Sequence, residues 1–248
     1  MYTEEERREV AWRRMSAEEK QAADPQRFLT EQAARAEQQA QAQARWTADQ
    51  LCRLNERLGP RYAGATLESY HVATDGQRAA LVALRDYADR LRDYGREGRG
   101  IVLYGGCGTG KDHLLGSLAR IAIGKYHVAV EWIRGVDLYA RFRDAIRTDT
   151  SESEIVDPLA AVPVLIISDP LPPVGPLTEF QAAALLRIID ERYRMMRRTW
   201  TSVNVASGAE ADQRLGAQVA DRLRDGALCI YCDWPTYRKA GTWSKDAR

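Results

Sequence analysis

Residues 101–115, IVLYGGCGTGKDHLL, constrain the fold more than any other part of the chain. The stretch begins with β-branched and aromatic residues that favour a strand, and four of the next six residues are glycines. Glycines permit a tight turn with positive φ, and the apolar spacing that follows suits a helix. A strand that turns directly into a helix is typical of layered α/β proteins.

The pattern after Gly100 extends this prediction. Helical patterns separate five β-rich runs, at residues 101–104, 128–133, 162–167, 200–205 and 228–232. Strands that are apolar throughout and alternate with helices are typical of a parallel sheet covered on both faces. The sequence therefore predicts an α/β core with a five-stranded parallel sheet between helices.

The chain before this core is helical in pattern and poor in large apolar residues. Residues 30–45 consist mainly of Ala, Gln and Arg, which favour helix but cannot form a core. Large apolar residues flank them: Trp12, Met15, Phe28, Leu29, Trp46, Leu51, Leu54 and Leu58. The segment is either a mobile solvated arm or a helical partner-binding region, and exposed aromatic residues favour the second. Gly59 and Pro60 break the pattern, so we predict domains at 1–58 and 59–248.

Composition limits the classes of protein that fit. The chain has 248 residues and a formal net charge of +1, which suits one medium α/β domain with an appendage and excludes a histone-like polycation. Its apolar runs are too short to span a bilayer, and residues 1–14 lack the apolar region of a secretory signal. We therefore expect a cytoplasmic protein without membrane association.

Cys229 and Cys232 form a CxxC pair, but a zinc site would need a second pair of ligands, and the three histidines lie elsewhere. We predict buried structural thiols on a strand; a metal or redox role is the alternative.

The glycine-rich turn has the GxxxxGK pattern of a phosphate-binding loop in the required strand-to-helix context. Its backbone N–H groups and the helix N-terminus favour phosphate oxygens, and the lysine supplies a point charge. We predict that it binds ATP with Mg²⁺; the alternative is a glycine-rich turn with a solvated lysine. The predicted nucleotide-binding residues are Gly105, Gly106, Cys107, Gly108, Thr109, Gly110, Lys111, Asp112 and His113.

Two positions depart from the usual pattern of such sites. The residue after the lysine, normally Ser or Thr, is Asp112. The strand at 162–167 is followed by Ser168, where the magnesium-side Asp belongs, and then by Asp169, where the water-activating carboxylate belongs. One hypothesis is an exchange, in which an Asp112–Ser168 pair retains one carboxylate and one hydroxyl beside the metal.

Two alternatives remain open. Asp112 lies close to the expected phosphates, and two unit charges ~6 Å apart at an effective dielectric of ~20 repel by roughly 3 kcal/mol. In the first alternative this repulsion is not offset, and the site is a degenerate, slow ATPase. In the other alternative the register is shifted, and Asp169 is itself on the metal side. The exchange predicts that nucleotide affinity depends unusually strongly on Mg²⁺.

From about residue 58 to 237, the chain resembles the DnaC-type helicase loaders and the related IstB-type transposition ATPases of the AAA+ superfamily. The stretches that carry the resemblance are RYAGATLESY, GTGKDHLL, RLGAQVADRLRDGA and DWPTYR. The resemblance implies a P-loop AAA+ ATPase core behind a small helical N-terminal domain. Some DnaC proteins carry Asn after the lysine, so Ser168 is the larger departure, and it bears on hydrolysis more than on binding.

The resemblance also implies roles for three residues. Arg222 matches the arginine finger that stabilises the γ-phosphate of a neighbouring subunit; otherwise it would be an ordinary helix-surface arginine, and Arg224 is a near competitor. Asn204 falls at the end of the fourth strand, where the family carries a water-orienting residue. Arg238 would contact nucleotide phosphates. A finger that acts across subunits implies a homo-oligomer formed on ATP and DNA.

The stretch 133–147, IRGVDLYARFRDAIR, contains four arginines with aromatic residues between them. Arginines contact phosphates and aromatic rings stack on bases, which suits single-stranded DNA. The candidates are Arg134, Tyr139 and Arg143; the alternative is an amphipathic helix with solvated charges.

In DnaC-type loaders the cargo is the replicative hexameric helicase, and in IstB-type proteins it is a transposase with target DNA. The resemblance thus implies an ATP-controlled helicase loader in DNA replication. The alternatives are a transposition ATPase and a nucleotide-gated binding switch with little or no hydrolysis.

Overall fold

A computed structural model of the chain describes residues 3–238, which fall into two compact units that divide between Asp49 and Gln50. Helix α3 (Pro25–Leu58) continues from the first unit into the second and ends one residue before Gly59. Its last turns belong to the larger unit because Leu54 is buried and Leu58 lies against Gly116. The compact core therefore begins before the Gly-Pro break that marks the end of the helix.

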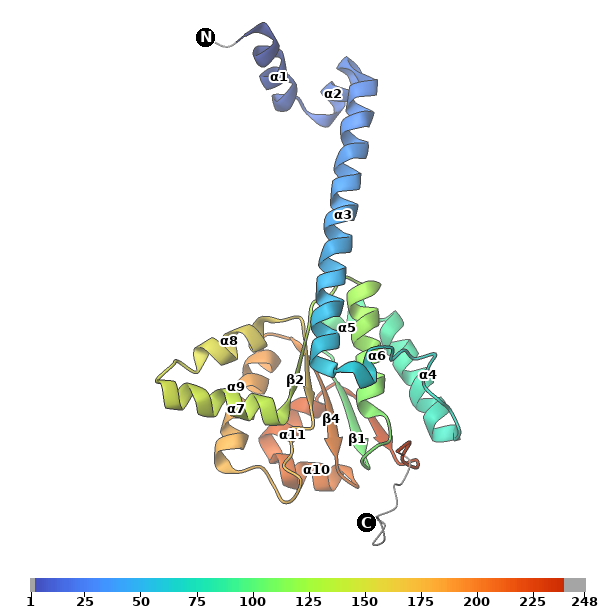
Figure 1. Ribbon diagram of the computed structural model, residues 1–248, viewed down its shortest axis with the longest axis vertical. Helices are drawn as coiled ribbons and strands as arrows, with labels where there is room; N and C mark the ends of the chain where they lie inside the picture. The colour runs from blue at the N-terminus through green and yellow to red at the C-terminus, as the bar shows by residue number, and fades with distance from the viewer. Residues whose placement is uncertain (1–2, 239–248) are drawn as a thin grey trace, which may run out of the picture. The chain divides into compact units, whose positions relative to one another are not determined.

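The larger unit contains the predicted five-stranded parallel sheet (Figure 1). Its strands are β1 (Ile101–Gly105), β2 (Val130–Arg134), β3 (Val164–Ser168), β4 (Arg198–Asn204) and β5 (Leu228–Cys232), in the order β2-β3-β4-β1-β5. All four pairings are parallel. The fold class predicted from the sequence is confirmed.

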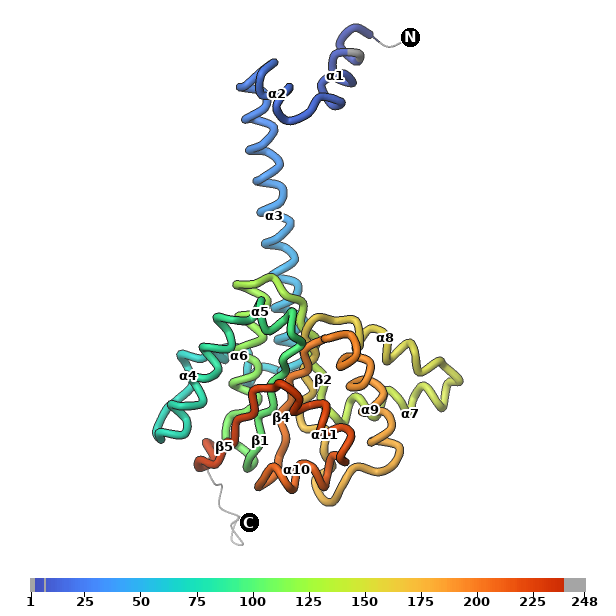
Figure 2. Tube along the Cα trace, turned by 180° about the vertical axis from the view of Figure 1, so that it is seen from behind, coloured from blue at the N-terminus to red at the C-terminus, as the bar shows by residue number. Residues whose placement is uncertain are grey.

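Helices cover both faces of this sheet (Figures 1 and 2). One face packs against α4 (Asp75–Asp89) and α6 (Lys111–Gly124), next to the short η1 (Pro60–Tyr62) and α5 (Leu91–Arg96). The other face packs against α7 (Gly135–Thr148), α8 (Ser153–Ala161), α9 (Glu179–Arg194), α10 (Gly208–Leu215) and α11 (Ala217–Arg224). Because side chains alternate along a strand, Leu165 and Ile167 join the second group, and Ser168 points toward α6.

A fully buried arginine stabilises the end of the sheet where its strands begin. The Arg192 side chain is 0% exposed and donates hydrogen bonds to carbonyl oxygens of Leu159, Ala160, Val162 and Arg198 and to the Thr199 hydroxyl. Burial lowers the pKa of Arg192 to about 9. Its acceptors include the last carbonyls of α8, so the cation serves as a cap at the negative end of that helix.

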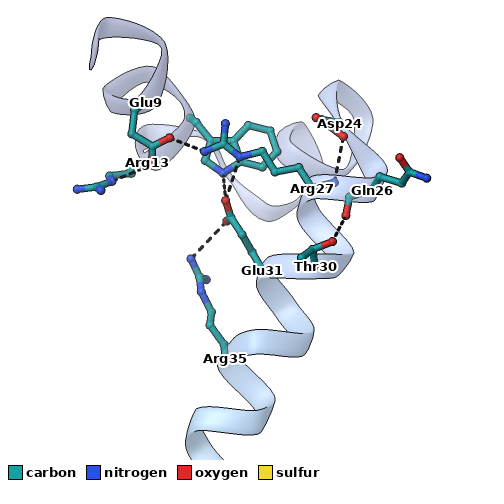
Figure 3. A network of polar contacts seen from close by, with 9 residues as sticks. Glu9, Arg13, Asp24, Gln26, Arg27, Thr30, Glu31 and Arg35 are labelled. Carbon is teal, nitrogen blue, oxygen red and sulfur yellow. Dashed lines mark hydrogen bonds and ion pairs between the residues drawn. The ribbon is translucent and has the colours of Figure 1, made fainter. Parts of the chain in front are cut away.

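The N-terminal unit is formed by α1 (Glu4–Arg14), α2 (Ala17–Ala23) and the first part of α3. Trp12 is only 7% exposed, because the Arg27 guanidinium lies 4.4 Å from the ring centroid. The indole Nε1 donates to Glu31 at 2.8 Å, and Arg27 pairs with Glu9 and Glu31 (Figure 3). The expectation of an exposed tryptophan is therefore wrong. Cation–π packing and ion pairs bury it without a large apolar core.

The CxxC prediction is half right. Cys232 is buried, and burial raises the pKa of its thiol to about 12, but Cys229 is exposed. β5 is the outer neighbour of β1, so its side chains alternate between covered and open. Among residues 3–238, no group of three or more His, Cys, Asp or Glu side chains could hold a metal ion. No helix in the same range is long and apolar enough to cross a membrane.

Candidate functional site

A cleft of about 270 Å³ lies where β1, β3 and β4 end and α6 begins. The carboxyl ends of parallel strands are the usual place for ligands in α/β sheets. Of the residues predicted from the sequence, Cys107, Gly108, Gly110, Lys111, Asp112, His113, Asp169, Asn204 and Arg238 line it. Arg61, Tyr62, Ser69, Tyr70, His71 and Tyr237 also line it and were not predicted.

The loop between β1 and α6 needs glycine at two points in particular. Gly108 has φ +80°, and a Cβ there would lie 2.0 Å from Thr236 Oγ1. Gly110 has φ +89°, and a Cβ there would lie 2.7 Å from the Tyr70 ring. The conformation and the close approach both require glycine. No side chain caps the N-terminus of α6, so its first-turn N–H groups remain available to an anion.

Three aromatic residues hold two carbonyl groups of the loop by hydrogen bonds. Thr109 O accepts hydrogen bonds from the Tyr70 hydroxyl at 2.9 Å and the Trp234 indole at 2.8 Å. Gly108 O accepts one from the Tyr237 backbone N–H at 2.9 Å. In a planar trans peptide the N–H points opposite to the C=O. The three aromatic residues therefore turn the amides of Thr109 and Gly110 away from themselves, as phosphate binding requires.

Lys111, the lysine of the GxxxxGK pattern, lies beneath the loop. Its side chain is buried, and Nζ donates to Gly105 O at 3.0 Å and to Gly106 O at 2.8 Å. Burial lowers its pKa. The ammonium group makes its hydrogen bonds to neutral carbonyl groups at the edge of an open cleft, so a phosphate can replace them with a charge-assisted bond.

Asp112, the unusual residue after the lysine, meets the unusual residue of β3. Ser168 Oγ is 3.0 Å from both Asp112 carboxylate oxygens. Ser202, from β4, donates to Asp112 Oδ1 at 2.8 Å. The structure thus brings together the two residues of the exchange hypothesis and adds a second serine that the sequence analysis missed.

Asp169, the residue after β3, points into the same cleft. Its φ is +46°, a left-handed conformation that is unfavourable for a residue other than glycine and is often found at functional sites. Asn204 Nδ2 donates to Asp169 Oδ1 at 2.5 Å. Although the residue is exposed to the cleft, desolvation by the surrounding protein raises the pKa of Asp169, and the charge of Asp112 adds to the rise.

An aromatic wall closes the side of the cleft next to η1. The rings of Tyr70 and Tyr237 meet edge to face with centroids 5.5 Å apart, and Tyr70 meets His113 in the same way at 5.4 Å. His113 Nε2 lies 2.9 Å from Thr66 O, so this ring is tied to the segment before α4. Flat apolar surfaces beside a phosphate loop suit a nucleobase.

The other predicted residues lie outside this cleft. Arg222, on α11, forms a 2.8 Å ion pair with Asp190 and lines a separate hollow together with Arg99 and Arg197. That hollow, of about 530 Å³, is larger than the cleft, but it lacks the loop. Arg222 is therefore not in contact with a nucleotide bound to its own chain.

The predicted stacking role of Tyr139 is wrong. Tyr139 is 3% exposed, and its hydroxyl donates to Pro170 O at 2.8 Å; the neighbouring aromatic residue Phe142 is buried as well. Their positions on α7 form the apolar face that covers the sheet, so they cannot stack on bases. Arg143 is exposed, and Arg134 is exposed but forms two hydrogen bonds to Asp137.

The residues of the cleft fit a magnesium-bound nucleoside triphosphate. The loop amides and Lys111 suit phosphate oxygens. Mg²⁺ is bound by hard oxygen ligands, commonly one or two carboxylates together with substrate phosphates. Asp112 and Asp169 provide such carboxylates, and Ser168 provides a hydroxyl next to them.

Comparisons with known proteins agree with this geometry. The replicative helicase loader DnaC of Buchnera aphidicola subsp. Schizaphis graminum (strain Sg) is 26% identical over 183 residues, which cover 72% of this chain and 71% of that protein. A crystal structure of the DnaC helicase loader superposes with a TM-score of 0.64 and 22% identity over 70% of this chain and 99% of that one. A crystal structure of DnaI superposes with a TM-score of 0.58 and 22% identity over 74% of this chain and 93% of that one.

These structural similarities confirm the predicted α/β fold of the core. The family model of the IstB-like ATP binding proteins matches residues 28–240. That range covers most of the chain and includes the loop, both serines of the cluster and Arg222. The chain therefore belongs to the family of IstB-like ATP binding proteins.

Proposed function

We propose that this chain binds ATP with Mg²⁺ in the cleft and uses the nucleotide to control the loading of a replicative hexameric helicase onto single-stranded DNA. The observation that carries the proposal is the glycine-rich loop, whose Gly108 and Thr109 carbonyls are engaged by Tyr70, Trp234 and Tyr237 and whose residues Gly108, Gly110 and Lys111 line the cleft. The similarity to DnaC, a replicative helicase loader, supports the helicase as cargo.

Within the cleft, each predicted residue has a chemical role. Lys111 and the loop amides bind the β- and γ-phosphates, and Arg238 adds positive charge on the open side. Asp169 accepts a proton from the attacking water, and Asn204, which donates to Asp169, orients that carboxylate. A bound Mg²⁺ supplies charge neutralisation for the phosphates.

Arg222 acts in trans in this proposal. It lies away from its own cleft, is partly exposed, and has a single ion pair to Asp190 that a stronger anion can replace. A guanidinium at the γ-phosphate of a neighbouring copy would stabilise transition-state charge by a factor of about 10³–10⁵ in rate. The active species is then a homo-oligomer assembled on ATP and DNA.

Contact with single-stranded DNA rests on fewer groups than the sequence suggested. Arg134 and Arg143 on or next to α7 remain the candidates, now as phosphate contacts without aromatic stacking. The N-terminal unit, with its partly exposed Leu29 and Val10, is the proposed region for contact with the helicase.

Co-purification of the intact chain with the replicative hexameric helicase encoded in the same genome tests the proposal. We expect a complex that forms with ATP and Mg²⁺ and is weakened by Lys111→Ala. The matched control is Lys125→Ala, which removes an exposed lysine at the other end of the same helix. Failure of the intact chain to bind the helicase under any nucleotide condition would contradict the loader role.

The family match favours a second candidate, a transposition ATPase, because the matched family is named after IstB. The same co-purification with a transposase and double-stranded target DNA distinguishes the two cargoes. Phosphate release by the wild type, Lys111→Ala and Arg222→Ala then separates an ATPase from a binding switch. Equal release by all three proteins would favour a switch without hydrolysis.

A further inference from the structure

Three side chains from three separate elements meet under the cleft. Asp112 comes from the first turn of α6, Ser168 from the end of β3 and Ser202 from β4. Asp112 Oδ1 accepts from Ser202 at 2.8 Å and lies 3.0 Å from Ser168 Oγ, and the two hydroxyls are 3.4 Å apart. Ser168 and Ser202 are 3% and 1% exposed, so they are part of the protein interior.

The sheet places the two serines side by side. β3 and β4 are parallel, and Ser168 and Ser202 are direct partners in their register. Side chains alternate along each strand, and Trp200, two residues before Ser202, contacts Tyr87 of α4. Both hydroxyls therefore point toward the layer that contains α4 and α6, where Asp112 lies.

Burial makes this cluster costly unless it is fully hydrogen-bonded. An unpaired hydroxyl inside a sheet is unfavourable, and both serines avoid that cost by donating to the same carboxylate. Two donors fix the position of the carboxylate, and Asp112 at the same time lines the cleft, next to Lys111. Because two buried hydroxyls fix its position, the Asp112 carboxylate is pre-organised for a ligand in the cleft that it lines.

We propose that the metal-side carboxylate of this chain has moved from strand β3 to helix α6. Asp112 is then the protein carboxylate for the Mg²⁺ of a bound nucleotide, and Ser168 and Ser202 are the positioning residues that aim it. This inference rests on the proposed nucleotide binding. A single carboxylate together with substrate phosphates is a common way for a protein to hold Mg²⁺.

The exchange makes a prediction that a merely degenerate site does not. With the metal, Asp112 is attracted to the complex; without it, the same carboxylate repels the phosphates. We therefore expect the affinity of wild-type protein for a fluorescent ATP analogue to fall at least 30-fold when Mg²⁺ is replaced by EDTA. Asp112→Asn keeps the size of the side chain but removes the charge. In this variant the affinity should fall less than about threefold when Mg²⁺ is replaced by EDTA.

Reciprocal substitution is the decisive experiment. Asp112→Thr should lose the Mg²⁺ dependence, and Ser168→Asp alone should place two carboxylates together and weaken binding of the Mg²⁺ complex about tenfold or more. The double variant, which restores one carboxylate on β3 and one hydroxyl on α6, should recover the Mg²⁺ dependence to within about threefold of wild type. Thermal unfolding of each variant checks that it is folded.

Ser202→Ala tests the positioning role, with Ser117→Ala as its matched control. Ser117 is also buried, but it donates to the His113 carbonyl within α6 and away from Asp112. Mn²⁺ titration of the nucleotide-bound protein, followed by electron paramagnetic resonance, should show metal affinity reduced threefold to tenfold by the first substitution and unchanged by the second. Equal effects of both would show that Ser202 is structural only.

Two outcomes overturn the inference at different levels. If wild-type protein binds the analogue equally well with and without Mg²⁺, or if Asp112→Asn retains the full dependence, Asp112 is not the metal-side carboxylate, although nucleotide binding stands. If wild-type protein that is folded binds no adenine nucleotide at any Mg²⁺ concentration, the proposed function fails together with the inference.

Discussion

The two ends of the parallel sheet each contain a buried cation, and the cations are used differently. At the end where the strands begin, Arg192 is 0% exposed, and its acceptors are four backbone carbonyls and the Thr199 hydroxyl. At the end where the strands finish, Lys111 is 5% exposed, lines the open cleft, and donates to the carbonyls of Gly105, which is buried, and Gly106, which is exposed.

The two cations differ in whether their acceptors are accessible, and this difference separates a stabilising role from a functional one. Most of the hydrogen bonds of Arg192 are buried, so loss of the side chain leaves their acceptors unsatisfied. Of the acceptors of Lys111, Gly106 lies at an exposed position and its carbonyl can be hydrated, and the lysine can exchange its carbonyl acceptors for a phosphate. A buried charge therefore indicates a binding site only where its partners can be replaced. Substitution of Arg192 should accordingly lower the free energy of unfolding, and substitution of Lys111 should lower the affinity for ATP.

The largest effect should come from Arg192→Met. The substitution keeps much of the volume but leaves several buried carbonyls without a donor, including the last ones of α8. We expect the free energy of unfolding to fall by about 4 kcal/mol, measured by urea denaturation. Arg194→Met, two residues along the same helix at an exposed position, should change it by less than about 0.5 kcal/mol. Similar losses for both would contradict the contrast.

The second largest effect should come from Lys111→Ala. Hydrogen bonds to charged groups contribute roughly 1.5–3 kcal/mol, so we expect ATP affinity to fall about 100-fold, measured by calorimetry. The free energy of unfolding should fall by only about 1 kcal/mol, because the Gly106 carbonyl lies at an exposed position and the Gly105 carbonyl alone is left buried. Loss of stability without loss of affinity would place Lys111 in the same class as Arg192.

The sequence determined the architecture of the core better than it determined the site. The predicted strands agree with the structure to within two residues at each end, because runs that are apolar throughout have few alternatives in a parallel sheet. The exchange of Asp112 and Ser168 could be proposed because both positions have fixed places relative to a motif. Their contact follows from the fold.

Other parts of the site had no signal that assigned them a role, although Tyr70, Trp234 and Tyr237 lie within RYAGATLESY and DWPTYR, two stretches that carry the family resemblance. Ser202 lies inside the run TWTSVN, where nothing distinguishes a ligand-positioning serine from an ordinary strand residue. Tyr70, Trp234 and Tyr237 reach the loop from segments more than 30 residues away. Tyr139 was misassigned even though its spacing from Leu138 and Phe142 fits the buried face of α7. That apolar periodicity was the better guide than the interleaved arginines.

Two cysteines at the same end of the sheet offer a smaller, finer comparison. Cys107 is exposed on the loop, and Cys232 is buried beneath Gly105, with its pKa raised to about 12 by desolvation. Saturating nucleotide should slow alkylation of Cys107 by iodoacetamide about tenfold, since the ligand covers the loop. Cys232 should react only as fast as the protein unfolds. Mass spectrometry of the two peptides measures both rates, and rapid reaction of Cys232 in the folded protein would contradict its burial.

The smallest effect concerns Asp169, whose pKa is raised by desolvation and by the charge of Asp112. The folded state binds this proton more tightly than the unfolded chain, so the free energy of unfolding falls as the pH rises above the ordinary aspartate value of 3.8. Asp169→Asn removes the cost of desolvating a charged carboxylate next to Asp112 and should stabilise the protein at pH 7. The gain should remain below about 1 kcal/mol, because the cleft is open to water.

The pH profile identifies the cause of that gain. The stability difference between Asp169→Asn and wild type should shrink as the pH falls toward 3.8, where the wild-type carboxylate is increasingly protonated. Asp157→Asn, at an exposed position on α8, is the control and should show no gain. A gain that is independent of pH would mean that the asparagine packs better in the left-handed conformation of residue 169, which asparagine adopts readily. In that case the backbone conformation of residue 169, and not the charge of its side chain, would be what lowers the free energy of unfolding of the wild-type protein.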